Sequence, residues 1–263
     1  MCDNQPLNNR KDNKGFWNQT QVDKSQRTKV KILTFLKFSG IFNKLHGGNR
    51  IMKDNQDMLW VFDMDGTLYS GVDRVWGEIE KEMARYLQGL GHPVRFDRAE
   101  QDLLRAKWQT RQTTIAYIYE FKLDFENVIE ETHLPILGNL VVELRVGAQS
   151  IQHLPGKKIV LTNSPESFAH ALLKKLGIHH FFDAILGLRT DVFDAKPNAL
   201  SYQRITKGHR VVMIEDWEEN LVIPNQLGWA TAWFPEEDQS HRPFFPEHVH
   251  KHITSLEELQ TFI

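Results

Sequence analysis

Residues 60–69 have the sequence WVFDMDGTLY, in which an apolar run leads into two aspartates and a glycine. The apolar run predicts a buried strand, and parallel strands present the residues that follow them at the edge where ligands bind. Asp63 is a candidate nucleophile, because a carboxylate can attack phosphorus and form an aspartyl-phosphate. Asp65 points to the same side and can protonate a leaving alkoxide and later deprotonate water. The stretch therefore predicts phosphoryl-transfer chemistry.

The two residues after this aspartate pair also suit such a site. Gly66 permits a sharp turn after the strand. The Thr67 hydroxyl is a candidate to hydrogen-bond a carboxylate or phosphate oxygen. Acidic turns after strands also occur as plain turn chemistry, so this motif alone leaves a structural alternative open.

A second apolar strand is predicted to end at Thr162 and to lead into a helix. Ser164 suits the N-cap and Pro165 the first helical position, and Gly177 is expected to end the helix. Thr162 is then expected beside a helix N-terminus, where backbone amides attract a phosphate. An ordinary capped helix is the alternative for this segment taken alone.

Two further segments add a cation and more acids. Lys196 precedes a helix that is predicted to begin at Pro197, and a cation there can neutralise the nucleophile and the phosphoryl oxygens. Residues 210–216 form another apolar strand, which ends in Glu215 and Asp216. Magnesium prefers hard oxygen ligands and retains several waters, so two or three carboxylates from separate strand ends suffice to bind it.

These four motifs, in this order, resemble those of the haloacid dehalogenase (HAD) superfamily. The resemblance implies a doubly wound, mostly parallel, Rossmann-like α/β sheet with an inserted α-helical cap. It implies Mg²⁺ as the cofactor, held by the side chains of Asp63 and Asp216 and by the Asp65 backbone carbonyl. The second acid of the pair takes the metal in that pattern, which selects Asp216 over Glu215. Asn220 stands where many relatives carry a further aspartate, so the charge of that group is missing here.

The spacing between the first two motifs predicts an insertion. Ninety-seven residues separate Asp65 from Thr162, far more than one crossover helix needs. Apolar residues at helical spacing predict helices within residues 75–90 and 98–119. The superfamily places a mobile cap here, which excludes water and selects the leaving group. The expected division is a helical cap at 74–147 and a catalytic core at 55–73 plus 148–263.

The resemblance narrows to the pyrimidine 5′-nucleotidase branch. It rests on residues 65–69 (DGTLY), 108–114 (WQTRQTT), 131–133 (ETH), 162–165 (TNSP) and 215–221 (EDWEENL). Many relatives have Asn in place of Gly66 and Gly in place of Gln112. Neither difference removes a catalytic group, but the second lies in the expected specificity region.

The same resemblance supplies the candidates for substrate binding in the cap. These are Arg111, Thr113, Thr114 and His133. A structural polar contact is an equal alternative for His133. Trp108 and Tyr117 are interpreted as apolar core of the cap and not as platforms that stack on a base.

Composition limits the class of protein. Of 263 residues 41% are hydrophobic, and Cys2 is the only cysteine, which excludes an internal disulfide framework and makes a cytoplasmic location the default expectation. The sequence has no apolar stretch of transmembrane length and no nucleic-acid-binding motif. Residues 1–51 hold ten Lys and Arg against three Asp and Glu, a balance of +7 that leaves −9 for the rest. Phosphate affinity must then come from a local site of metal, lysine and amides.

The polar composition of the first thirty residues predicts disorder. We expect residues 1–51 to be a disordered or non-physiological extension, with Met52 as the hypothetical start of the native protein. A basic amphipathic helix at 30–45 that lies on a membrane surface is the alternative. We expect no membrane partner.

Together these features predict magnesium-dependent hydrolysis of a small phosphorylated metabolite, most specifically a pyrimidine nucleoside 5′-monophosphate. Asp63 attacks, Asp65 transfers the proton, Thr162 and the Asn163 backbone bind the phosphoryl group, and Lys196 offsets its charge. A sugar-phosphate phosphatase or a phosphomutase with the same residues remains an alternative, as does a non-catalytic sensor of a phosphate metabolite. Dehalogenation is disfavoured, because it needs neither an acid at position 65 nor magnesium.

Overall fold

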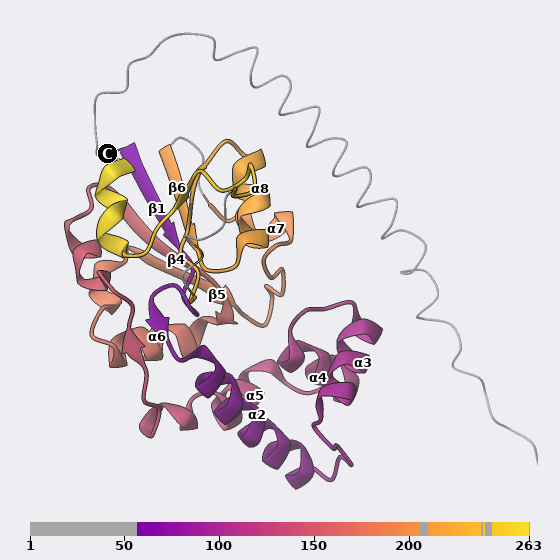
Figure 1. Cartoon of the computed structure of the whole chain (residues 1–263). Helices are drawn as coiled ribbons and strands as arrows, with labels where there is room; N and C mark the ends of the chain where they lie inside the picture. Colours follow the sequence, from indigo (N-terminus) through magenta and orange to yellow (C-terminus); the bar gives the residue numbers. More distant parts are fainter. Residues whose placement is uncertain (1–56, 206–209, 238, 240–243, 263) are drawn as a thin grey trace, which may run out of the picture. The chain divides into compact units, whose positions relative to one another are not determined.

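The structure is a computed structural model that describes residues 57–205, 210–237, 239 and 244–262 (Figure 1). The predictions for residues 1–51 and for Met52 lie outside the described residues. Within the described part, no helix has the length and apolar character that a membrane crossing requires.

Six parallel strands form the central sheet, in the order β5-β4-β1-β6-β7-β8. Their bounds are β1 Met58–Phe62, β4 Lys157–Pro165, β5 Ala184–Leu188, β6 Arg210–Glu215, β7 Ala230–Trp233 and β8 Lys251–His252. The first strand lies in the middle, where Trp60 pairs with Lys158 of β4 and with Val212 of β6. The chain runs outward from β1 in both directions, so the carboxyl end of β1 is the switch point at which open α/β sheets bind ligands. The predicted fold class is confirmed.

Helices cover both faces of the sheet, and the side chains of β1 alternate between them. Trp60 and Phe62 pack in one apolar cluster with α6 (Glu166–Lys175). Leu59 and Val61 pack in another with residues of α7 (Ala199–Tyr202) and of the chain next to α8 (Val222–Gln226). Figure 1 shows α6 on one side of the sheet and α7 and α8 on the other. This two-sided burial explains why β1 is apolar at every position.

Four α-helices, followed by the 3-10 helix η2 (Pro135–Gly138), are inserted between the short strands β2 (Tyr69–Ser70) and β3 (Glu143–Leu144). These inserted helices are α2 Val72–Gly89, α3 Arg98–Trp108, α4 Thr113–Phe121 and α5 Phe125–Thr132. They form most of a third apolar cluster, to which Leu188 of β5 also belongs; its members from the helices include Met83, Leu87, Leu104, Ile115, Tyr117, Phe125 and Val128. The insertion and its helical character are as predicted, while its division from the rest of the chain as a mobile cap stays a prediction.

The helical pattern expected over residues 98–119 is interrupted. Helix α3 ends at Trp108, the next residue Gln109 has a left-handed φ of 51°, and α4 begins only at Thr113. The ring of Trp108 at the end of α3 is 38% exposed, so its interpretation as core is wrong, whereas Tyr117 is fully buried as expected. Residues 109–112 therefore form a loop at one end of the inserted helices.

Strands β2 and β3 pair antiparallel, with Tyr69 opposite Leu144. The backbone amide of Arg145 extends this pairing by donating to the Leu68 carbonyl at 3.0 Å. The two chain segments that enter and leave the inserted helices thus run side by side, and we call them the β2–β3 ribbon.

Two local predictions about helix starts are wrong. Strand β4 continues through Ser164 to Pro165, and α6 begins at Glu166 without a side-chain cap. The Ser164 hydroxyl donates instead to Asp65 Oδ2 at 2.8 Å, because a long-range charged acceptor is available to it. After Lys196 the helix begins at Ala199 and not at Pro197.

Asn198 is the reason for that later start. Its side chain accepts a hydrogen bond from the Leu200 amide at 3.0 Å, which makes it the N-cap. The short 3-10 helices that complete the fold are η2 Pro135–Gly138, η3 Ala148–His153, η4 His179–Phe181, η5 Glu218–Leu221 and η6 Leu256–Phe262.

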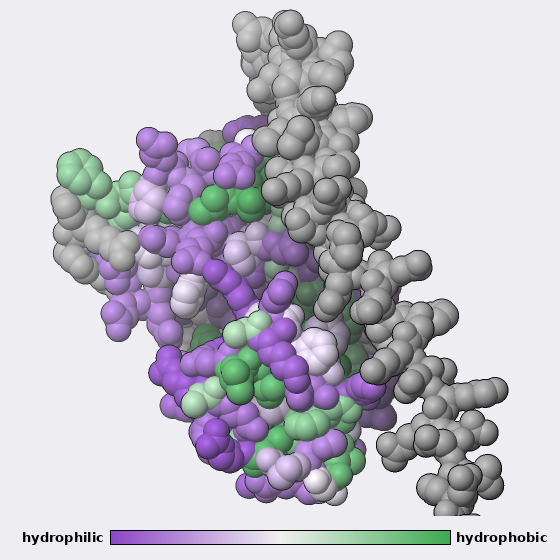
Figure 2. Space-filling view, turned by 90° about the vertical axis from the view of Figure 1, so that its right-hand side faces the viewer, coloured by the Kyte–Doolittle hydropathy of each residue, from purple (hydrophilic) through white to green (hydrophobic). Residues whose placement is uncertain are grey.

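Hydrophobic and hydrophilic residues are interspersed on the face of the molecule that Figure 2 presents. The large apolar side chains that are exposed on and next to the inserted helices are those of Leu90, Leu103, Trp108 and Tyr119. Single exposed apolar residues are normal on protein surfaces, so these positions do not identify a partner.

Candidate active site

The nucleophile candidate and the lysine meet at the carboxyl end of β1. The Asp63 amide donates to the Ile214 carbonyl of β6 at 2.9 Å, which ties Asp63, the residue after β1, to β6. Lys196 Nζ donates to Asp63 Oδ1 at 2.5 Å and to Glu215 Oε1 at 2.7 Å. Lys196 is 2% exposed, so its charge acts where water screens it little.

Asn163 holds the backbone of Lys196 through both ends of its side-chain amide. Asn163 Oδ1 accepts from the Lys196 amide at 2.7 Å, and Asn163 Nδ2 donates to the Lys196 carbonyl at 3.0 Å. The sequence predicts that the Asn163 backbone binds the phosphoryl group, but it does not predict these bonds from the Asn163 side chain to the Lys196 backbone. The amide pair ties the segment that carries the lysine to β4.

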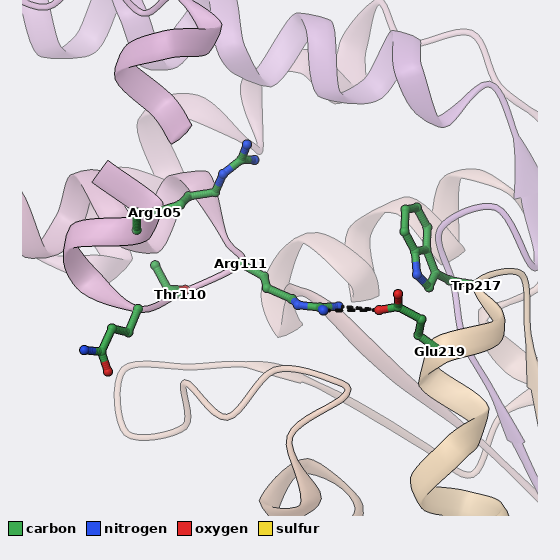
Figure 3. Close-up of a pocket in the computed structure, with 7 residues that line it drawn as sticks. Arg105, Thr110, Arg111, Trp217 and Glu219 are labelled. Atoms are coloured by element: carbon green, nitrogen blue, oxygen red, sulfur yellow. Dashed lines mark hydrogen bonds and ion pairs between the residues drawn. The ribbon is translucent and has the colours of Figure 1, made fainter. Parts of the chain in front are cut away.

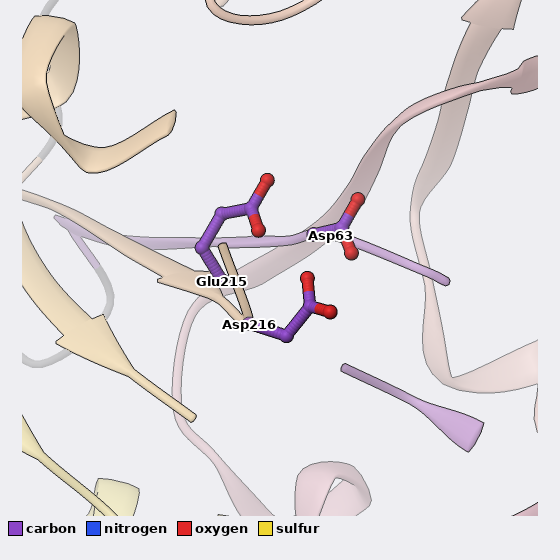
Figure 4. Close-up of side chains that lie close together, drawn as sticks. All are labelled: Asp63, Glu215 and Asp216. Atoms are coloured by element: carbon purple, nitrogen blue, oxygen red, sulfur yellow. The ribbon is translucent and has the colours of Figure 1, made fainter. Parts of the chain in front are cut away.

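Three carboxylates lie close together, as Figure 4 shows, and Lys196 donates to two of them. Asp63, Glu215 and Asp216 each offer an oxygen, and these oxygens lie within 4.8 Å of one another. We call these residues the acid cluster. Asp63 comes from the end of β1 and the other two from the end of β6, as expected from parallel strands that end at one edge.

The acid cluster holds more negative charge than one lysine offsets. Burial, and next the charge of Glu215, raise the pKa of Asp63 to about 8. The same two causes raise the pKa of Asp216 to about 10. Burial lowers the pKa of Lys196, but the charges of Asp63 and Glu215 outweigh it and raise the pKa. A divalent cation would relieve this excess, and oxygen donors of this kind fit Mg²⁺.

Within the acid cluster, the oxygens of Glu215 are already engaged. Glu215 Oε1 accepts from Lys196 and from Asn220 Nδ2 at 2.6 Å, and Oε2 accepts from the Trp217 amide at 2.9 Å. This engagement supports Asp63 and Asp216 as the direct side-chain ligands of a metal. Asn220 acts here as a donor that helps to fix Glu215.

Gly66 packs directly against Asp216. Its φ is +84°, and a Cβ built on it would lie 2.1 Å from Asp216 Oδ2. Only glycine combines this backbone conformation with such a close approach at low cost. The absence of a side chain at position 66 therefore leaves room for the Asp216 carboxylate.

Three hydroxyl groups hold the Asp65 carboxylate. Tyr69 Oη donates to Oδ1, while Oδ2 accepts from Thr162 Oγ1 at 3.1 Å and from Ser164 Oγ at 2.8 Å. Burial, and next the charge of Asp65, raise the pKa of Tyr69 well above its usual range, so the phenol stays a donor. Sequence reasoning missed Tyr69 and Ser164, since neither has a local signal for this contact. Thr67 Oγ1 is buried and has no hydrogen-bond partner within the described part of the chain.

The model of the haloacid dehalogenase-like hydrolase family matches residues 58–223, which contain every motif described above. The chain belongs to this family. The HAD superfamily resemblance predicted from the motifs is thereby confirmed, and the hydrolase class with it. No curated protein matches the sequence.

Solved structures share the fold of this HAD-like hydrolase at low identity. CbbY from Rhodobacter sphaeroides, in complex with phosphate, is 18% identical with a TM-score of 0.56, over 76% of this chain and 95% of that one. A HAD phosphatase from Thermococcus onnurineus is 17% identical with a TM-score of 0.54, over 78% and 97%. A predicted phosphoglycolate phosphatase from Haemophilus somnus is 14% identical with a TM-score of 0.54, over 80% and 99%. At these identities the likeness shows a common fold.

A pocket of about 510 Å³ lies between the loop after α3 and the segment that follows β6 in the HAD-like hydrolase (Figure 3). We call it the Trp217 pocket; its lining residues are Arg105, Ala106, Gln109, Thr110, Arg111, Trp217 and Glu219. Both terminal nitrogens of Arg111 donate to Glu219 Oε2 at 3.1 Å. Trp217 directly follows the metal-ligand candidate Asp216, and it is 60% exposed.

The candidates from the inserted helices are not all brought to this pocket. Arg111 lines the pocket. Thr113 does not line it, but accepts a hydrogen bond at 3.3 Å from Arg105, which does. Thr114 lies half-buried in the first turn of α4.

His133 is placed elsewhere. It is 2% exposed, its Nδ1 lies 2.7 Å from Thr132 Oγ1, and its ring meets Phe168 edge-on. Burial lowers the pKa of His133 to about 3, so the imidazole is neutral at physiological pH. This environment favours the structural alternative for His133 over substrate binding.

Proposed function

We propose that this HAD-like hydrolase is a magnesium-dependent phosphomonoester hydrolase that acts through an aspartyl-phosphate on pyrimidine nucleoside 5′-monophosphates. The observation that carries the proposal is the arrangement around Asp63: a buried carboxylate, a buried lysine at 2.5 Å and a second metal-ligand candidate in the same acid cluster. Lys196, together with a bound Mg²⁺, would supply positive charge where a phosphoryl group meets an anionic nucleophile.

In the proposed reaction an Asp63 oxygen forms a bond to phosphorus while the bond from phosphorus to the leaving oxygen breaks. Asp65 gives its proton to that oxygen, and its carboxylate then takes a proton from water. The water oxygen attacks phosphorus, the bond to Asp63 breaks, and inorganic phosphate is released. Lys196 offsets the charge of the phosphoryl oxygens throughout. When bound, Mg²⁺ would align the phosphate with Asp63 and reduce their repulsion.

The Trp217 pocket supports the nucleotide assignment. An indole face that is 60% exposed can stack on a heterocyclic base, and Arg111 can hydrogen-bond its polar edge. Its volume of about 510 Å³ lies within the range usual for small-molecule sites. The pocket adjoins Asp216 through Trp217, so a base in it would lie on the side of the site that faces the inserted helices.

A sugar phosphate is the second candidate, and a specific observation favours it. Arg105 and Arg111 both line the Trp217 pocket, and two guanidinium groups suit a second anionic group as well as a base. The CbbY structure with xylulose-(1,5)-bisphosphate, which has a TM-score of 0.55 to this chain, comes from a protein of the same fold.

Release of inorganic phosphate from a panel of nucleoside monophosphates and sugar phosphates, with and without Mg²⁺, tests the proposal. Preference for UMP or CMP, lost in Asp63→Asn, is the expected result. Preference for sugar phosphates would be consistent with the proposed mechanism but would overturn the assignment of a nucleotide substrate. Isomerised phosphate ester without phosphate release would indicate a phosphomutase, and binding without any turnover would indicate a sensor.

Two variants separate the substrate classes further. If a base stacks on Trp217, Trp217→Ala lowers kcat/KM for UMP by about 5- to 150-fold, because each stacked base contributes about 1–3 kcal/mol. The same change leaves glycerol phosphate nearly unaffected. If the pocket binds a second phosphate instead, Arg111→Ala selectively impairs sugar bisphosphates and Trp217→Ala does not.

A further inference from the structure

The β2–β3 ribbon contacts the catalytic turn at two points. Tyr69, in β2, donates its hydroxyl hydrogen to Asp65 Oδ1. Arg145, directly after β3, donates to the Gly66 carbonyl at 2.6 Å and to the Pro235 carbonyl at 2.7 Å, with its guanidinium over the Phe234 ring. The Tyr69 contact fixes the carboxylate of Asp65, and the Arg145 contact fixes the carbonyl of the next residue, Gly66.

The first of these contacts is enclosed, and the second is partly buried. Tyr69 is fully buried, so its ring has no room to swing away from Asp65. The backbone pairing of Tyr69 with Leu144 sets the position of the ring relative to the second segment of the ribbon. Gly66 is confined on its other side by Asp216, since even a methyl group would collide there. The ribbon therefore holds Oδ1 of Asp65 through Tyr69, while Thr162 and Ser164 of β4 hold Oδ2.

We propose that Tyr69 is a positioning residue for the acid, and that the β2–β3 ribbon sets the orientation of the Asp65 carboxyl group through it. This proposal rests on the role of Asp65 in the proposed function. A proton donor must lie within hydrogen-bond reach of the leaving oxygen, and a displacement of about 1 Å can cost about 100-fold in rate. The ribbon connects both ends of the inserted helices. A displacement of those helices would therefore move Tyr69 and, through it, the Asp65 carboxyl group.

The test compares two leaving groups. An alkoxide needs a proton from Asp65 as it departs, whereas p-nitrophenolate is stable enough to leave without one. Tyr69→Phe removes the hydroxyl and keeps the ring. We expect kcat/KM for glycerol phosphate to fall by about 10- to 100-fold and kcat/KM for p-nitrophenyl phosphate to fall by less than about threefold. The ratio kcat/KM is used because it covers the steps through departure of the leaving group.

Controls distinguish positioning from loss of structure. Tyr117→Phe removes another hydroxyl from a fully buried tyrosine, far from Asp65 in sequence and bonded to Glu100. It is expected to leave the ratio between the two substrates unchanged. Ser164→Ala removes a different donor to Asp65 and is expected to shift the ratio in the same direction as Tyr69→Phe. In an Asp65→Asn background, Tyr69→Phe is expected to add no further loss for glycerol phosphate.

The outcomes separate this proposal from the one on which it rests. Equal losses for both substrates in Tyr69→Phe, or no loss for either, would overturn the positioning role while the hydrolase function stands. Additive losses in the Asp65→Asn background would also overturn it, since Tyr69 would then act elsewhere. Failure of the unmodified protein to release phosphate from UMP and from both test substrates with Mg²⁺ would overturn the proposed function, and this proposal with it.

Discussion

The excess of negative charge in the acid cluster predicts how stability depends on pH and on metal. Without metal, the folded protein holds a proton on Asp63 up to a pKa of about 8, whereas the unfolded chain releases it near 3.8. Between these values the folded state binds more protons, so stability is lost as pH rises. The loss is about 1.4 kcal/mol per pH unit for one such proton. For a domain of this size it lowers Tm by about 3–5 °C per pH unit.

Thermal unfolding between pH 5.5 and 7.5, in EDTA and in saturating Mg²⁺, checks this expectation. Bound Mg²⁺ favours the ionised carboxylates, so the decline in Tm seen in EDTA should largely disappear and the gain from Mg²⁺ should grow with pH. Asp63→Asn removes one of the two raised carboxyl groups, Asp216 being the other, and should reduce the slope of the EDTA curve. A Tm in EDTA that does not change with pH, or a gain from Mg²⁺ that is equal at all pH values, would refute the reasoning.

Three substitutions test other parts of the site. Asp63→Asn should reduce phosphate release by at least about 10⁴-fold, the scale of losing a nucleophile, in an assay that measures initial rates. Lys196→Met should lower kcat by about 100- to 1,000-fold, because it removes a buried charge that acts on the phosphoryl oxygens. Gly66→Ala should raise the Mg²⁺ concentration needed for half-maximal activity and lower stability by at least about 1 kcal/mol, since its φ is +84° and its Cβ would meet Asp216. Gly77→Ala, in α2 with open space around it, is the control and should be neutral or stabilising.

The central strands β1, β4 and β6 and the order of their catalytic groups were predictable because each of these strands contains an apolar run followed by polar residues. Residues such as Asp63, Lys196 and Asp216 need only follow the right strand to arrive at the same edge. Because parallel strands end at the same edge of the sheet, this proximity can be predicted without knowing any side-chain contact. The acid cluster is thus a consequence of topology.

Most of the contacts that orient those groups join residues distant in sequence and were therefore not predictable. The bond from Tyr69 to Asp65 spans only four positions, but neither residue type signals it. Ser164 has the local signature of an N-cap, yet a charged acceptor 99 positions away competes for its hydroxyl. Arg145 bonds to the carbonyl of Gly66, which lies 79 positions earlier, and the residues next to Arg145 in the sequence do not indicate this contact. The break after Trp108 was missed for a different reason: Gln109 takes a left-handed conformation without the glycine or asparagine that usually signals one.

The position of β1 in the sheet also bears on how the chain reaches its folded state. The two partners of Trp60, Lys158 and Val212, lie 98 and 152 positions later in the sequence. An emerging chain therefore carries a wholly apolar strand long before either partner exists to cover it. Contacts between such distant segments form slowly, and exposed apolar strands aggregate in the meantime. We expect folding of this protein to be slow and its yield to depend on chaperones or on low concentration, whereas the inserted helices, with their local contacts, form early.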